Sequence, residues 1–155
     1  MEKYYYKYDE FKDDVKSLAF KVKSFNPDVL LSVARGGVTL GHGLSLALDM
    51  RELYTLNSVH YDNTTKLDTV KISNIPDLSK VKKVLIVDDM VDSGETMKEI
   101  FKVLKENYPL VDFKLATIFY KNDALLQPDF KLKIAHEWID FFWEVDFIEE
   151  EKNDI

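Results

Sequence analysis

The stretch Val84-Leu-Ile-Val-Asp-Asp-Met-Val-Asp-Ser-Gly-Glu-Thr-Met97 predicts a buried strand, a pair of carboxylates and the start of a helix. Val84 to Val87 is an unbroken apolar run rich in β-branched residues, which is typical of a strand buried on both faces of a parallel sheet. Asp88 and Asp89 follow it. Burying either charge without a partner would cost on the order of several kcal/mol. We therefore expect this pair at the mouth of the sheet, facing a polar ligand or a metal ion.

A helix is expected from about Gly94, because apolar residues then recur on one helical face: Met97, Ile100, Phe101 and Leu104. Ser93 is the predicted N-cap. The first N–H groups of a helix have no partner inside it, and the helix dipole adds roughly 0.3–2 kcal/mol for an anion placed there. Asp92, Ser93 and Gly94 thus predict a phosphate site. Carboxylates beside it would repel a simple phosphate. A phosphorylated sugar fits both halves if the carboxylates hold its hydroxyls or Mg²⁺.

The ordered motif from Val84 to Thr96, an apolar strand followed by Asp-Asp-x-x-Asp-Ser-Gly-x-Thr, resembles the phosphoribosyl pyrophosphate (PRPP) loop of the type I phosphoribosyltransferases. The resemblance implies that Asp88 and Asp89 hold the ribose hydroxyls, directly or through Mg²⁺, and that Asp92 is the catalytic group that meets the base at N7. It implies that five residues surround the 5′-phosphate: Asp92, Ser93, Gly94, Glu95 and Thr96. The Glu95 side chain is expected to point to solvent.

A receiver domain of a response regulator also has an apolar strand that ends in Asp-Asp. Receivers carry that pair near their start, with further functional residues on later strands. Too little chain follows Asp89 here to complete such a fold.

Bulk composition narrows the class of protein. The 155-residue chain has a net charge of −7, which disfavours nucleic acid as a partner, and 46% hydrophobic residues, as in ordinary globular proteins. It has no cysteine, which excludes disulfides, thiolate catalysis and cysteine zinc sites, and its three histidines lack the spacing of a zinc motif. With no secretory signal and no membrane-spanning run, we expect a cytoplasmic protein that is not an integral membrane protein.

A second strand–turn–helix unit lies upstream. An amphipathic helix is predicted over Asp9 to Phe25, then a buried strand over Asp28 to Ala34, which runs into Arg35-Gly36-Gly37 and a further helix. Beside the later motif, Arg35, Gly36 and Gly37 resemble the family's pyrophosphate loop, and the planar guanidinium of Arg35 suits phosphate oxygens.

Two other glycine patterns occur in this turn and the helix that follows it. Gly36 and Gly41 have the spacing of a P-loop, but His42-Gly43 stands where Lys-Ser/Thr is required. Gly41-His42-Gly43 lacks the third glycine of a dinucleotide fingerprint.

The middle of the chain predicts a strand over Arg51 to Tyr61 that leads into a polar segment from His60 to Lys66. The resemblance implies a mobile loop that closes over the substrates, with Lys66 or Lys71 in place of the arginine that other members carry. A simple surface hairpin loop would have the same composition.

The last part of the chain predicts the base site. A strand over Asp112 to Phe119 is followed by Lys121, and a short strand is predicted over Lys131 to Glu137. By resemblance to purine members, Lys121 donates to the purine 6-oxo group. The following segment resembles the C-terminal hood of bacterial xanthine-guanine phosphoribosyltransferases, which implies that Trp138 stacks on the base and Ile139 offers a backbone carbonyl. An aromatic cluster serving as core or dimer surface is the alternative.

Together these features predict a doubly wound, mainly parallel α/β sheet in one domain over residues 1–155. The core of the domain is expected at about 26–135. The mid-chain loop and the C-terminal residues 136–148 are expected to form a small hood, and residues 149–155 a solvated tail. The resemblance implies an Mg²⁺-dependent enzyme that converts PRPP and an oxopurine into a nucleoside monophosphate and pyrophosphate, and that forms homo-oligomers, dimers or tetramers. Transfer to orotate, uracil or adenine, and a non-catalytic PRPP sensor, remain alternatives.

Overall fold

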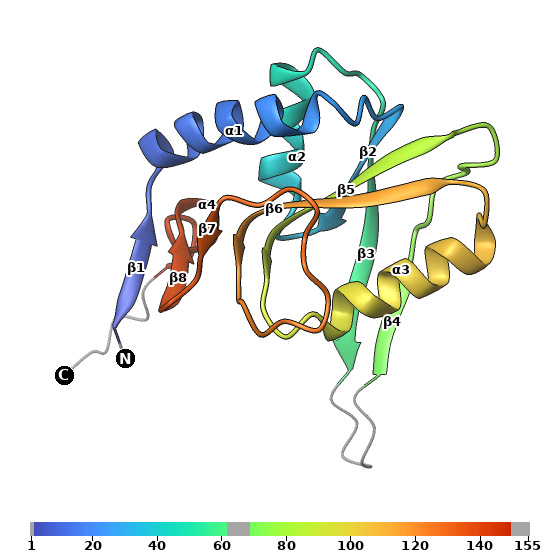
Figure 1. The fold of residues 1–155 in the computed structure, drawn as a ribbon. Coiled ribbons are helices and arrows are strands. Elements are labelled where there is room, and N and C mark those ends of the chain that lie inside the picture. Colours follow the sequence, from blue (N-terminus) through green and yellow to red (C-terminus); the bar gives the residue numbers. More distant parts are fainter. Residues whose placement is uncertain (1, 62–68, 150–155) are drawn as a thin grey trace.

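A six-stranded sheet with the order β4-β3-β2-β5-β6-β7 runs through the centre of the molecule (Figure 1). The structure is a computed structural model that describes residues 2–61 and 69–149. The strands are β2 (Val29–Ala34), β3 (Leu53–Tyr61), β4 (Thr69–Ser73), β5 (Lys83–Val91), β6 (Asp112–Tyr120) and β7 (Lys133–Ile134). Neighbouring strands are parallel except for β3 and β4, which form an antiparallel hairpin.

Helices cover both faces of this sheet. α1 (Tyr8–Val22) and α2 (Val38–Ala47) lie on one face and α3 (Glu95–Asn107) lies on the other (Figure 1). Side chains alternate along each buried strand, so that Leu85 packs in the cluster with α1 and α2, whereas Ile86 packs in the cluster with α3. This arrangement confirms the predicted doubly wound, mainly parallel α/β fold. Within the described ranges, no helix combines the length and the apolar character needed to cross a bilayer.

The glycines that mimic nucleotide-binding motifs lie inside α2. A Cβ atom on Gly41 would lie 1.8 Å from Oγ of Ser32 in β2, and one on Gly43 would lie 3.1 Å from Cγ2 of Val15 in α1. The two glycines therefore allow α2 to approach its neighbours closely. This packing role accounts for them without any phosphate contact.

A separate two-stranded sheet forms the hood. β1 (Lys3–Tyr6) pairs in parallel with β8 (Trp138–Phe141), which is followed by the short helix α4 (Phe142–Val145). The C-terminal part of the hood is as predicted, and it pairs with the N-terminal strand; the predicted mid-chain part of the hood falls mostly on residues 62–68, outside the described residues. The mid-chain segment forms the β3–β4 hairpin at the opposite edge of the central sheet. Lys71 lies in β4, and Lys66 lies outside the described residues.

Three predicted boundaries are wrong. β5 does not end at Val87 but continues through Asp88 and Asp89 to Val91, because pairing with β6 continues along this stretch. The strand predicted over Lys131 to Glu137 is reduced to β7, which pairs with β6 at only two positions. The first helix begins at Tyr8 and ends at Val22, not at Phe25.

Candidate functional site

Two cavities open at the C-terminal end of β5, and the alternation of the strand divides its carboxylates between them. Asp88 faces the start of α3, whereas Asp89 faces the hood. Both cavities are also lined by Met90 and Asp92, so they are neighbours. Ligands in open α/β sheets bind at this edge. A substrate with two chemically different ends could occupy both cavities at once.

The smaller cavity has a volume of about 200 Å³ and lies at the N-terminus of α3. It is lined by Asp88, Met90, Val91, Asp92, Ser93, Gly94, Thr96 and Met97. A helix N-terminus presents backbone N–H groups that attract anions. The geometry therefore suits a phosphate group, with Asp88 at its margin.

The N-cap of α3 is Gly94 and not the predicted Ser93. Gly94 has a φ of 85°, and a Cβ atom there would lie 2.8 Å from the backbone nitrogen of Leu126. Only glycine tolerates both conditions. Ser93 instead uses its Oγ to accept a hydrogen bond from the Glu95 N–H, at 3.3 Å. The Glu95 side chain is exposed, as expected.

The larger cavity has a volume of about 830 Å³ and lies between the sheet edge and the hood. Its lining residues are Glu2, Asp89, Met90, Asp92, Lys121, His136, Glu137, Trp138, Ile139, Phe141 and Glu144. Lys121 Nζ lies 2.5 Å from Oδ1 of Asp92, so the ammonium at the end of β6 is held above the cavity. The Trp138 ring is 58% exposed, which leaves it available to a ligand.

Both strand carboxylates have raised pKa values because they are largely removed from water, although part of each side chain reaches the surface. Burial raises the pKa of Asp88 well above its usual range, and the charge of Asp89 adds to this effect. Burial also raises the pKa of Asp89 to about 6, and the negative charge of Glu144 acts in the same direction. The Asp89 N–H donates a hydrogen bond to Oδ1 of Asp88, at 3.0 Å.

This donor set fits Mg²⁺. Among the residues that the structure describes, no lysine or arginine forms an ion pair with Asp88 or Asp89, and no group of three or more acidic or histidine side chains could hold a metal ion alone. Mg²⁺ usually takes only one or two carboxylates and completes its shell with water and substrate phosphates. Two desolvated carboxylates beside a phosphate site are suited to that mode of binding.

The predicted pyrophosphate turn packs directly against the end of β5. The peptide bond between Ala34 and Arg35 is cis. A Cβ atom on Gly36 would lie 2.7 Å from Oδ2 of Asp89, and one on Gly37 would lie 2.3 Å from the carbonyl oxygen of Val87. The two glycines are therefore required for this close approach. The Arg35 side chain is exposed and lines neither of the two cavities.

The family model described as a phosphoribosyl transferase domain matches residues 3–149. This chain belongs to the phosphoribosyltransferase family. Members of this family are pentosyl-transferring enzymes, and the predicted enzyme class is therefore confirmed, while the receiver interpretation is excluded.

Several known proteins are similar to this phosphoribosyltransferase. A xanthine-guanine phosphoribosyltransferase of Ruegeria sp. is 27% identical over 89% of this chain and 83% of the relative. The solved structure of a Helicobacter pylori xanthine-guanine-hypoxanthine phosphoribosyltransferase is 42% identical, covers 94% of this chain and 96% of that one, and superposes with a TM-score of 0.87. A purine phosphoribosyltransferase from Pyrococcus horikoshii is 28% identical with a TM-score of 0.81, over 98% of this chain and 100% of that one.

Most predicted site residues of this phosphoribosyltransferase gather at the two cavities, with four exceptions. Asp89, Asp92, Lys121, Trp138 and Ile139 line the larger cavity. The smaller cavity is lined by Asp88, Asp92, Ser93, Gly94 and Thr96. Glu95, Arg35, Gly36 and Gly37 line neither cavity.

Sequence reasoning missed six lining residues of the larger cavity: Glu2, Met90, His136, Glu137, Phe141 and Glu144. Glu144 had a usable signal, because it directly follows the second tryptophan of the hood. Glu2 had none, because only the pairing of β1 with β8 brings the N-terminus to the cavity.

Proposed function

We propose that this phosphoribosyltransferase transfers the 5-phosphoribosyl group of PRPP to N9 of an oxopurine, namely guanine, xanthine or hypoxanthine, in purine salvage. The products are the nucleoside 5′-monophosphate and pyrophosphate. The observation that carries the proposal is the adjacency of the two cavities at the end of β5. One has the features of a phosphate site and the other offers an exposed aromatic ring and a lysine. The names of the relatives with similar sequences and structures support the same substrates.

PRPP would span the end of β5. The backbone N–H groups at the start of α3 would hold its 5′-phosphate, together with the hydroxyls of Ser93 and Thr96. Asp88 and Asp89 would accept hydrogen bonds from the ribose hydroxyls or hold Mg²⁺. The turn Arg35 to Gly37, which contacts Asp89 through Gly36, would bind the pyrophosphate.

The base would lie in the larger cavity against Trp138. Lys121 would donate a hydrogen bond to the 6-oxo group, and a donor at this place disfavours adenine, whose 6-amino group would leave it unpaired. The backbone carbonyl of Ile139 would meet the 2-position. Hypoxanthine, guanine and xanthine share the 6-oxo group that this arrangement requires.

The reaction breaks the bond between the anomeric carbon and a pyrophosphate oxygen and forms a bond from that carbon to N9. Positive charge develops on the ribose in an oxocarbenium-like state, which the carboxylates Asp88 and Asp89 would stabilise. Asp92 would accept the proton that the purine loses, through N7. Bound Mg²⁺ would neutralise the leaving pyrophosphate. Alignment of the two substrates can lower the activation free energy by roughly several kcal/mol.

An assay of pyrophosphate release with PRPP, Mg²⁺ and a panel of bases tests the proposal. We expect turnover with at least one oxopurine and less than about a hundredth of that rate with adenine, orotate or uracil. A preference for one of the latter bases would identify the same chemistry on another acceptor. Binding of PRPP without turnover on any base would favour a PRPP sensor.

A further inference from the structure

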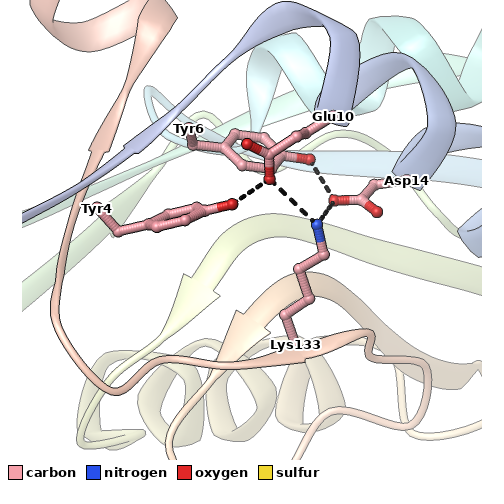
Figure 2. Close-up of polar contacts among 5 residues, drawn as sticks. All are labelled: Tyr4, Tyr6, Glu10, Asp14 and Lys133. Carbon is pink, nitrogen blue, oxygen red and sulfur yellow. Dashed lines mark hydrogen bonds and ion pairs between the residues drawn. The ribbon is translucent and has the colours of Figure 1, made fainter.

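Five polar side chains join the hood to the core of the protein away from the two cavities (Figure 2). They are Tyr4 and Tyr6 of β1, Glu10 and Asp14 of α1, and Lys133 of β7, and we call them the Lys133 network. Lys133 Nζ lies 2.7 Å from Oδ2 of Asp14 and 3.5 Å from Oε2 of Glu10. The Tyr6 hydroxyl donates a hydrogen bond to Asp14 at 2.7 Å, and the Tyr4 hydroxyl donates one to Glu10.

The network is built around one shared ammonium group. Asp14 is 9% exposed and Tyr6 is fully buried. Within the described parts of the chain, Lys133 is the one cation that pairs with either Glu10 or Asp14. Removal of that charge would leave the largely buried Asp14 with a hydroxyl donor but no counter-charge, beside a second carboxylate. The tyrosines join β1 to α1 and Lys133 joins β7 to α1, so the network links three elements.

Those three elements support the wall of the larger cavity. In the β1–β8 register, Tyr4 lies opposite Ile139 and Tyr6 lies opposite Phe141, and both partners line that cavity. Lys133 lies in β7, three residues before His136, where the chain enters the wall. The network thus holds the strand that pairs with the wall and the strand that leads into it, and it holds both to α1.

The wall residues Ile139 and Phe141 pack in the core cluster with Tyr6 and Phe119, but this packing is incomplete on one side of the wall. An open cavity of about 290 Å³ lies behind it, lined by Tyr4, Phe119, Lys133, Ile134, His136, Glu137 and Ile139. Ile139 faces both this cavity and the larger one. Tyr4 and Lys133 line this cavity, and their polar ends bond to Glu10 and Asp14 of α1. The network therefore adds polar contacts where side-chain packing is incomplete.

We propose that Tyr4, Tyr6 and Lys133 are positioning residues for the purine, because the Lys133 network sets the distance between the Trp138–Ile139 wall and Lys121. This inference rests on the proposed function and names the residues that tune its base site. None of the three lines the larger cavity or the smaller one, where the residues proposed to hold the 5′-phosphate lie. Their loss should therefore change the KM for the base and leave the KM for PRPP unchanged.

The cleanest test replaces single hydroxyl groups on one strand. Tyr4→Phe removes the hydroxyl that donates to Glu10 of α1. Tyr5→Phe is its matched control, because the Tyr5 hydroxyl bonds within the hood, 2.6 and 2.8 Å from the two carboxylate oxygens of Asp146. We expect Tyr4→Phe to raise the KM for the oxopurine roughly three- to tenfold, which corresponds to the ordinary net contribution of one exposed hydrogen bond. Tyr5→Phe should keep the wild-type value.

A second test removes and restores the shared charge. Lys133→Gln should raise the KM for the base by at least about tenfold, because a wall displaced by about 1 Å can reduce rates on the order of a hundredfold. Lys133→Arg should recover most of the loss, because it keeps the charge. Adding Asp14→Asn to Lys133→Gln should produce less than the sum of the two single effects, since the amide leaves no buried charge unpaired.

The outcomes separate the two proposals. If the wild-type protein does not turn over any oxopurine, the proposed function fails. If it does, but Tyr4→Phe and Lys133→Gln keep the wild-type KM for the base, the positioning role is wrong. An equal rise in the KM for PRPP would also overturn it, because general loosening would then explain both. If Lys133→Gln does not fold, the comparison of Tyr4→Phe with Tyr5→Phe still decides.

Discussion

The ammonium of Lys121 lies 2.5 Å from Oδ1 of Asp92, so the residues that directly follow β6 and β5 are joined in the lining of the larger cavity. Their side chains are 42% and 66% exposed, and an ion pair exposed to this degree contributes at most about 1 kcal/mol to stability. We have assigned Lys121 to the 6-oxo group of the purine and Asp92 to N7. Binding of the base would therefore replace a weak contact between these residues with two contacts to the ligand.

The first prediction separates the structural and functional roles of Lys121. Lys121→Met should change the free energy of unfolding by less than about 1 kcal/mol, because the ion pair is exposed. It should lower kcat/KM for the oxopurine by roughly a hundredfold or more, because a polar base would then face an apolar group. Chemical denaturation and steady-state kinetics measure the two effects. Lys131→Met is the matched control, because Lys131 Nζ bonds to Gln127 outside the cavity. Similar losses in both variants would contradict the assignment.

Local patterns predicted the centre of the fold. The apolar run before Asp88 and the helical spacing after Gly94 are short-range signals, and both elements occur where these signals place them. The continuation of β5 through Asp88 and Asp89 was missed, because carboxylates are rare in strand interiors and only pairing with β6 keeps them there. The left-handed Gly94 displaced Ser93 from the N-cap, because the turn before α3 must pass close to Leu126.

Long-range pairing could not be predicted from the sequence. Tyr4 to Tyr6 carried no sign that they pair with residues 139 to 141 near the other end of the chain. Once this pairing exists, it also divides the aromatic residues of the hood. Phe141 and Trp143 pack in the core cluster, whereas Trp138 stays exposed at the cavity. The core interpretation of this aromatic segment thus holds for Phe141 and Trp143, whereas the base-site role of Trp138 stays a prediction.

The second prediction concerns the paired carboxylates. The double variant Asp88→Asn with Asp89→Asn should lose turnover and keep its fold, because amides preserve the shape of the site but do not provide the charge that stabilises the ribose or holds Mg²⁺. Circular dichroism and the pyrophosphate assay measure these two properties. Mg²⁺ with pyrophosphate should raise the melting temperature of the wild-type protein and leave that of the variant unchanged. Retained activity in the double variant would count against the assignment of both residues.

The third prediction is a pH effect on stability in the absence of divalent cations. The folded-state pKa of Asp89 is raised from 3.8 to about 6, so the folded state binds more protons than the unfolded state between these values. The stability contributed by Asp89 is therefore fully present below pH about 4 and is lost as the pH rises through about 6. Asp89→Asn should flatten this part of the profile and be at least as stable as the wild-type protein at pH 7. Urea denaturation in EDTA across this pH range measures the free energy of unfolding of both proteins. Identical pH profiles for Asp89→Asn and the wild-type protein would refute the prediction.

The fourth prediction compares two glycines at which an added Cβ atom would meet different neighbours, backbone at Gly94 and a side chain at Gly36. Gly94→Ala should lower the free energy of unfolding by about 1–3 kcal/mol, because its φ of 85° is unfavourable for alanine and the new Cβ would lie 2.8 Å from a backbone nitrogen. Gly36→Ala should cost less stability, because its Cβ would meet the Asp89 carboxylate, a side chain that can move. That movement should lower kcat by at least roughly tenfold. Denaturation midpoints and kcat together test this contrast, and equal stability losses would contradict it.

The last prediction uses the two tryptophans of the hood as a matched pair. Trp138 is 58% exposed, and stacking of a base on an aromatic ring contributes about 1–3 kcal/mol. Trp138→Ala should therefore raise the KM for the oxopurine roughly ten- to hundredfold with little change in stability. The Trp143 ring stacks on Phe141 with centroids 4.6 Å apart and meets Phe11 at 5.4 Å, so Trp143→Ala should mainly lower the free energy of unfolding, by on the order of 2–4 kcal/mol. In the Trp143→Ala protein, the remaining Trp138 fluorescence should be quenched when the nucleoside monophosphate binds. If the nucleoside monophosphate leaves that fluorescence unchanged at saturating concentration, Trp138 does not form the wall against which the base stacks.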